Sequence, residues 1–185
     1  MTTVAAFVDD GKVFMAADSC ATVYDRHIRG VKKIRRYETV SGEQFLIGYA
    51  GITAIADCAE SSLQIVVSTH SSDMIMLNKF AFGIAKIISG VAIDCNITEN
   101  GRLDATCLLA YRGNVWTISH MGAIHHENGI AAIGSGEAYA IGAMYALHSR
   151  SAPGPFVASE AVGIAIHNDI YSGGDVNIET LGRVA

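Results

Sequence analysis

The amino-acid sequence predicts an α+β fold built as a four-layer αββα sandwich. Strand-like apolar runs come first, then two helices, then further strands, two more helices and a last strand. The strand runs are mostly continuous apolar stretches, which indicates sheets that are covered on both faces. Antiparallel hairpins buried on both sides need a helix layer outside each sheet, and the two helix pairs supply those layers.

Six apolar runs predict the strands, and short turns join four of them into hairpins. The turn "DDG" joins the first two runs and "RG" joins the fourth and fifth, as expected for tight hairpins. Near the C-terminus, "YSGGDVNIETL" returns the chain to a turn and a strand. The predicted strands cover residues 2–8, 12–18, 44–50, 105–111, 114–119 and 129–134.

Four stretches with helical signals predict the two outer layers, and they cover residues 53–69, 73–89, 137–148 and 158–168. Pro153 and Pro155 separate the last two helices. The stretch "MIMLNKFAFGIAKIISGVAI" is interrupted by Asn78, Lys79 and Lys86. It therefore predicts a core helix and not a membrane span.

Length and composition predict one self-associating domain. The 185 residues suit a single domain over 1–185. Half of the residues are hydrophobic and 17% are charged, against a usual charged share of about 25%. Part of the exterior is therefore expected to be covered by copies of the same chain. The formal net charge of −5 gives no general attraction to nucleic acid.

Cysteine and histidine spacing predicts neither a disulfide framework nor a metal site. The four cysteines lie far apart, and the start of the chain lacks a basic region and a cleavage motif. We therefore expect reduced thiols in a cytoplasmic protein. His125 and His126 are adjacent and would point to opposite faces of a strand, and no other His lies at a ligand spacing. We expect no metal and no cofactor.

The start "MTTVAAFV" offers a candidate nucleophile in Thr2. If Met1 is removed, as is usual before a small side chain, Thr2 carries the free α-amine, whose unperturbed pKa is about 7.7–8.0. That value suits a general base acting on the hydroxyl of the same residue. The alternative interpretation is that the two threonines merely begin a strand.

Asp18 and Lys33 form a candidate ion pair. A carboxylate that ends a buried strand needs a cation or several donors, and Asp18 ends "VFMAAD". If "GVKKIRR", residues 30–36, is a strand, Val31, Lys33 and Arg35 share one face. An inward Lys33 would pair with Asp18, and its ammonium would lower the pKa of a nearby N-terminal amine. The alternatives are a capped strand end and a solvated basic strand edge.

Three further motifs offer polar groups at element ends. In "GYAGITAIADCAE", Gly51 lies between a strand and a helix start, where a backbone N–H can face a developing oxyanion or simply form a turn. The segment "AIGSGEAYAIG" matches neither a phosphate loop nor a nucleophile elbow, so Ser135 is a helix N-cap or a supporting hydroxyl. Asp169 and Ser172 lie at the end of a helix, where short polar groups are often caps.

The order of these motifs resembles that of the proteasome β-subunit family, which belongs to the N-terminal nucleophile hydrolases. An initial Thr-Thr strand, "AAD", "VKK", "AG", "GSG" before a helix and "DIYSGG" follow one another from Thr2 to Val176. The resemblance implies a threonine endopeptidase with Thr2 as nucleophile and its amine as base. It also implies that Asp18 holds the catalytic Lys33 and that the Gly51 N–H stabilises the oxyanion.

The resemblance assigns further site positions as well. Ser135, Asp169 and Ser172 match the polar residues that support the nucleophile. The residues that match the specificity pocket are Ala21, Val31, Arg35, Tyr49 and Thr53. A bulky Tyr49 would narrow that pocket, so the cleavage preference need not copy that of any relative.

The resemblance also implies an assembly. The start without a propeptide is similar to the bacterial peptidase HslV, whereas "DIYSGGDVN" is closer to true proteasome β-subunits, which indicates a separate bacterial or phage homologue. Stacked homo-oligomeric rings of six or seven subunits, polypeptide substrates and an AAA+ ATPase that feeds the chamber are the implied partners, without nucleic acid or membrane. Two alternatives stay open: an N-terminal nucleophile amidase that acts on small amides, and a catalytically silent ring protein.

Overall fold

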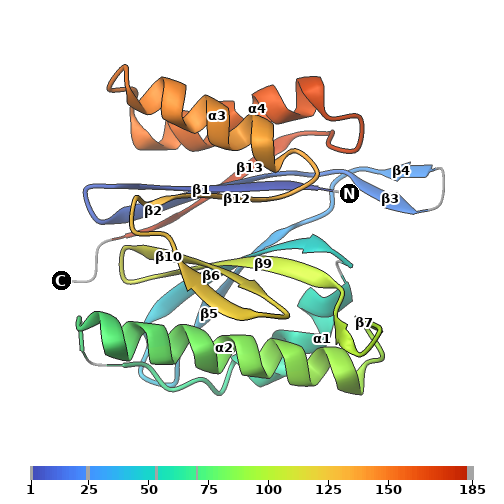
Figure 1. The fold of residues 1–185 in the computed structure, drawn as a ribbon, viewed down its shortest axis with the longest axis vertical. Helices are drawn as coiled ribbons and strands as arrows, with labels where there is room; N and C mark the ends of the chain where they lie inside the picture. The colour runs from blue at the N-terminus through green and yellow to red at the C-terminus, as the bar shows by residue number, and fades with distance from the viewer. Residues whose placement is uncertain (1, 24–25, 53, 70, 183–185) are drawn as a thin grey trace.

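Two β-sheets lie face to face between two pairs of helices in the computed structural model, which describes residues 2–23, 26–52, 54–69 and 71–182 (Figure 1). The pair α3 and α4 covers one sheet, and the pair α1 and α2 covers the other (Figure 1). The predicted four-layer αββα sandwich is confirmed.

The first sheet has four antiparallel strands in the order β12-β1-β2-β13. Its hairpin β1–β2 turns through Asp10 and Gly11, which both have positive φ, as the predicted "DDG" turn requires. Thr3 pairs with Gly134 across β1 and β12, which brings the chain start next to the "GSG" segment. The strands are β1 (Thr3–Asp9), β2 (Lys12–Asp18), β12 (Ile130–Gly134) and β13 (Val176–Leu181).

The second sheet has five antiparallel strands in the order β11-β10-β9-β6-β5. The predicted turn between β9 and β10 is confirmed, with positive φ at Arg112 and Gly113. Its strands are β5 (Ile34–Glu38), β6 (Gln44–Gly51), β9 (Ala105–Tyr111), β10 (Asn114–Ser119) and β11 (Gly122–His125). Two short ribbons pair β3 (Ala21–Val23) with β4 (Arg26–Ile28), and β7 (Thr98–Glu99) with β8 (Arg102–Leu103).

The helices are α1 (Ala54–Leu63), α2 (Met74–Asp94), α3 (Glu137–His148) and α4 (Gly154–Asn168). The prediction was right for α3, too long for α1 and too short for α2. It also began the last helix at residue 158, whereas α4 begins at Gly154. Pro155 therefore lies in the first turn of α4, where a proline suits the helix because that N–H has no intrahelical partner.

Alternating side chains of the strands divide the interior into three layers. In β1, Val4 and Ala6 face the second sheet, while Ala5 and Phe7 face α3 and α4. In β6, Leu46 faces the first sheet and belongs to the core between the sheets. Both faces of the central strands are thus buried, which explains why the strand runs in the sequence are continuously apolar.

The segment 30–36 differs from its prediction as a strand. Only its last part is a strand, because β5 begins at Ile34. Lys33 therefore lies in the extended connection just before β5, and the N–H of Tyr49 in β6 donates to its carbonyl (2.9 Å). The strand β11 and the two short ribbons were not predicted, because segments of two to four residues are too short to show the alternation of apolar and polar residues that is typical of a strand.

Helix α2 is long and apolar enough to cross a membrane by length and composition alone. One such helix is weak evidence for a membrane span, because a buried core helix meets the same criteria. Its inner side chains, among them Leu77, Ile84 and Ile88, pack in the core between the second sheet and α1. Apolar side chains also lie on its outer surface, where Ile75 and Phe82 are exposed.

Gly48 marks the point where the two sheets approach closely. A Cβ at Gly48 would lie 2.6 Å from Val4 Cγ1 and 3.0 Å from Met15 Sδ. We expect Gly48→Ala to lower the free energy of unfolding by about 1–3 kcal/mol in denaturant titrations, because the added methyl overpacks the core. The matched control is Gly90→Ala on the exposed face of α2, where nothing lies within 4 Å. It should be neutral or stabilising by up to about 1 kcal/mol. Equal stability of the two variants would contradict this account of the packing.

Candidate active site

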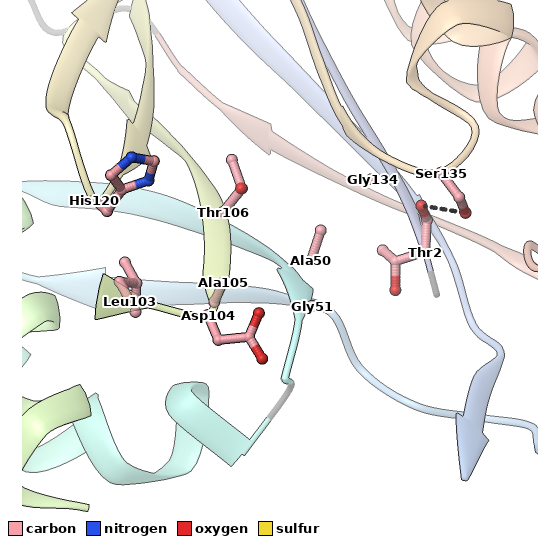
Figure 2. Close-up of a pocket in the computed structure, with 10 residues that line it drawn as sticks. All are labelled: Thr2, Ala50, Gly51, Leu103, Asp104, Ala105, Thr106, His120, Gly134 and Ser135. Carbon is pink, nitrogen blue, oxygen red and sulfur yellow. Dashed lines mark hydrogen bonds between the residues drawn. The ribbon is translucent and has the colours of Figure 1, made fainter. Parts of the chain in front are cut away.

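Thr2 lines a cavity of about 330 Å³ at one end of the space between the two sheets (Figure 2). Its side chain points across the cavity toward Ala50 and Gly51, the last residues of β6 (Figure 2). The residue before β1 and the end of β12 form one wall, and the end of β6 with the start of β9 forms the other. The lining residues are Thr2, Ala50, Gly51, Leu103, Asp104, Ala105, Thr106, His120, Gly134 and Ser135.

Asp18 and Lys33 form a fully buried ion pair directly behind the chain start. Lys33 Nζ donates to Asp18 Oδ1 (2.7 Å) and to the carbonyl of Cys20, and neither charged side chain is exposed. The same Oδ1 accepts the N–H of Thr3 (2.8 Å), while Oδ2 accepts those of Gly173 (3.0 Å) and Cys20 (3.3 Å). The buried carboxylate thus has one cation and three backbone donors, which offset its desolvation. The predicted pairing of an inward Lys33 with Asp18 is confirmed.

The pKa of Lys33 is lowered. Burial is the largest cause, and the hydrogen bond and the negative charge of Asp18 oppose it. Lys33 therefore gives up its proton more readily than an exposed lysine does. Such a group is suited to a site in which protons move.

Ser135, Asp169 and Ser172 form a second polar cluster next to Thr2. Ser135 Oγ donates to Asp169 Oδ2 (2.5 Å) and lies 3.4 Å from the carbonyl oxygen of Thr2 (Figure 2). Ser172 Oγ donates to the same Asp169 oxygen (2.7 Å). Burial raises the pKa of Asp169, but the hydrogen bonds from Ser135, Ser172 and the N–H of Tyr171 outweigh it, so the pKa is lowered. Asp169 is therefore ionised at neutral pH.

The "GSG" segment brings its backbone against the chain start. Gly134 has a φ of 94°, and a Cβ there would lie 2.0 Å from the carbonyl oxygen of Thr2. A Cβ at Gly136 would lie 2.0 Å from Thr3 Oγ1. Glycine is thus required on both sides of Ser135. The N-cap residue of α3 is Gly136 and no side chain caps this helix, so the interpretation of Ser135 as an N-cap was wrong.

Gly51 lies at the end of β6 with a φ of 94°, on the cavity wall that faces Thr2. Its backbone packs tightly against β9, because a Cβ would lie 3.0 Å from the carbonyl oxygen of Asp104 and 3.1 Å from Ala105 Cα. The structure thus brings Gly51 into the same cavity as Thr2. Its role as an oxyanion donor stays a prediction.

Four of the five residues predicted to bind substrate do not line this cavity. Among the described residues, the cavity wall includes none of Ala21, Val31, Arg35 or Tyr49, and Thr53 lies outside the described residues. Ala21 lies in β3, and Val31 lies in the connection before β5. The roles of these five residues stay predictions.

Two of these residues already have partners within the chain. Arg35 pairs with Asp57 and Glu60 of α1. Tyr49 is 1% exposed, and its hydroxyl bonds that of Tyr37 (2.8 Å). Tyr49 thus packs in the core between the second sheet and the helices, and burial raises its pKa well above the usual value.

The sequence analysis missed two parts of this site. The segment 103–106 reaches the cavity only because β9 pairs with β6, which aligns Ala105 with Gly51 from a distant part of the chain. Thr3 contacts both polar clusters, through its N–H and its hydroxyl. Only its position next to Thr2 could have indicated a role for it. In the described part of the chain, no group of three or more His, Cys, Asp or Glu is placed to hold a metal ion.

Comparisons with known proteins were made for the whole chain, and no family model matches it. The chain is 31% identical over 184 residues to the ATP-dependent protease subunit HslV of Syntrophobacter fumaroxidans, covering 97% of this chain and 96% of that protein. The fold is similar to that of BPH from Thiobacillus denitrificans in complex with epoxomicin (TM-score 0.80, 21% identity, 99% and 100% of the two chains). It is also similar to HslV from Trypanosoma brucei (TM-score 0.70, 23% identity, 98% and 99%).

The two members of the buried ion pair should differ in their effect on stability. Asp18→Ala leaves the Lys33 ammonium buried with the Cys20 carbonyl, so we expect a loss of about 3–5 kcal/mol in the free energy of unfolding. Lys33→Met keeps the volume and leaves Asp18 its three backbone donors, so a loss of about 1–2 kcal/mol is expected. Urea titrations of the purified variants measure both values.

A surface pair provides the control for this prediction. Arg36 and Glu179 pair at 2.9 Å with side chains that are 31% and 29% exposed, so Arg36→Met should cost less than about 1 kcal/mol. If Lys33→Met lowered the free energy of unfolding more than Asp18→Ala, the three backbone donors would not be sufficient to stabilise the buried Asp18 carboxylate.

Proposed function

The chain belongs to the HslV and proteasome β-subunit family of N-terminal nucleophile hydrolases, and we propose that Thr2 is the nucleophile with which it cleaves polypeptides. The observation that carries this proposal is the position of Thr2: its side chain faces a cavity, and the buried Asp18–Lys33 pair holds the next residue in the chain. Membership of the family makes the protein a threonine-type peptidase.

The proposed reaction uses Thr2 twice, as nucleophile and as base. Once Met1 is removed, the α-amine of Thr2 takes the hydroxyl proton while the oxygen attacks the peptide carbonyl. The tetrahedral intermediate expels the amine of the departing peptide, which takes up the proton, and leaves an ester on Thr2 Oγ1. The same α-amine then removes a proton from water, whose oxygen attacks the ester. As the second peptide leaves as a carboxylic acid, the ammonium returns the proton to Thr2 Oγ1. Met1 lies outside the described residues.

We assign the surrounding groups roles in setting charge and orientation. The ammonium of Lys33 disfavours a second positive charge on the Thr2 amine, which keeps that amine neutral and basic. The N–H of Gly51, on the facing wall, is the donor that we assign to the oxyanion. Ser135, held by Asp169, packs against the carbonyl oxygen of Thr2 and limits the movement of the nucleophile from the other side.

We further propose that the sites face the chamber of stacked homo-oligomeric rings of six or seven subunits in the cytoplasm. An AAA+ ATPase would unfold the polypeptides that enter. The Syntrophobacter relative is named as an ATP-dependent protease subunit, which supports an ATPase partner. Exposed apolar side chains on the outer surface of α2, Ile75, Met76, Phe82 and Ile93, supply surface that a neighbouring subunit can cover.

Thr2 substitution tests the nucleophile. We expect Thr2→Ala to lower the turnover of a fluorogenic peptide by at least about 10³-fold, because it removes the hydroxyl that forms the ester. Thr2→Ser keeps the hydroxyl and the amine and should retain measurable turnover. The purified assembly should also gain the mass of one peptide epoxyketone per chain on Thr2, as peptide mapping would show. Full activity of Thr2→Ala would overturn the assignment.

Two measurements on the wild-type protein distinguish the peptidase from the two alternatives, an amidase that acts on small amides and a catalytically silent ring protein. Intact mass should show that Met1 has been removed, and unfolded polypeptides should be cleaved in preference to a panel of small amides. Cleavage of the small amides alone would identify an amidase. Retention of Met1 together with inactivity on both panels would identify a catalytically silent ring protein.

A further inference from the structure

The hydroxyl of Thr3 connects to the second polar cluster. Thr3 is fully buried, and its Oγ1 lies 2.7 Å from Ser172 Oγ. Ser172 Oγ lies 2.7 Å from Asp169 Oδ2, which also accepts the hydroxyl of Ser135. The proton of Ser172 goes to Asp169, because an ionised carboxylate only accepts. Thr3 is therefore the donor to Ser172.

The backbone of Thr3 connects to the first cluster. Its N–H belongs to the peptide group that joins it to Thr2, and this N–H donates to Asp18 Oδ1 (2.8 Å). The carbonyl of the same peptide group faces Ser135 Oγ (3.4 Å). The N–H end of the peptide group that carries the nucleophile is therefore hydrogen-bonded, and its carbonyl end lies against Ser135. The orientation of this group sets the direction of the Thr2 amine and side chain.

The site leaves no room for a substitute for the Thr3 hydroxyl. The first turn of α3 closes over it, since a Cβ at Gly136 would lie 2.0 Å from Thr3 Oγ1. Ser172 is also buried, so a water molecule cannot simply replace the lost donor. Removing the Thr3 hydroxyl would therefore leave an acceptor of Ser172 unpaired in a buried place.

We propose that Thr3 is a positioning residue for the peptidase reaction. Its hydroxyl orients Ser172 against Asp169, and the same carboxylate holds Ser135 beside the carbonyl of Thr2. Its N–H holds the other side of the same peptide group to Asp18. This inference rests on the proposed function, because it assigns Thr3 an effect on the turnover at Thr2.

Exchange of Thr3 for its isostere tests the proposal in the assembled enzyme. Thr3→Val removes the hydroxyl and keeps the shape, so kcat for a fluorogenic peptide should fall about tenfold, while KM stays within about twofold. Thr3→Ser restores the donor, and its kcat should return to within about threefold of the wild-type value. A general packing defect would not be rescued by serine, which lacks the methyl group.

Thr39→Val is the matched control. Thr39 is 4% exposed, and its hydroxyl accepts from the N–H of Glu43 (3.0 Å) in the turn between β5 and β6, which does not line the cavity. This variant makes the same chemical change and should leave kcat unaltered. Equal kcat in Thr3→Val and wild type, or a Thr3→Ser no better than Thr3→Val, would overturn the role of Thr3.

A double-mutant cycle tests the route through Ser172. If Thr3 acts through that residue, Thr3→Val should cause no further loss of kcat in a Ser172→Ala background. If the two substitutions lowered kcat independently, so that their effects multiplied, the route through Ser172 would be overturned. This comparison of kcat values is valid even if Thr3→Val alone lowers the stability. An inactive wild-type assembly would overturn the proposed function and with it this role. An active wild type with an unaffected Thr3→Val would overturn only the role of Thr3.

Discussion

The carboxylate of Asp18 is the group on which the whole site depends. It lies in the interior with no exposed surface, so its charge must be balanced there. The balance comes from four parts of the chain: the start of β1, the connection after β2, the residue before β5 and the loop before β13. A single ionised group therefore fixes the nucleophile strand, the lysine and the C-terminal loop relative to one another. Four ordered segments of the chain together offset the desolvation cost of this one buried charge.

Those features that follow from local chemistry could be predicted from the sequence. The β1–β2 turn has its form because Asp10 and Gly11 accept positive φ, and α3 has the predicted bounds because alanine, glutamate, methionine and leucine in it favour a helix. The pairing of Asp18 with Lys33 was also within reach, since an inward lysine needs a carboxylate. The order of strand-like and helical stretches supplied the four layers, and the order of the motifs supplied the family.

Those features that depend on distant strand pairing could not be predicted. Nothing near residues 103–106 indicates a cavity wall, because that wall exists only once β9 pairs with β6. The first four residues of 30–36 were expected to belong to a strand, yet they form a connection from which Lys33 reaches Asp18. Thr3 also looks like an ordinary strand residue until Ser172 is brought beside it by the last helix.

The two walls of the cavity differ in the groups that they present. The wall built by β1 and β12 is crowded backbone against backbone, so a side chain at Gly134 would collide with the carbonyl of Thr2. The opposite wall presents Leu103, Asp104, Thr106 and His120, and the ion-pair and serine clusters use none of these side chains. Selectivity for different polypeptides can therefore diverge at these four side chains, because neither the ion pair, the serine cluster nor the backbone N–H that we assign to the oxyanion depends on them. One cavity wall thus combines exchangeable side chains with a fixed backbone.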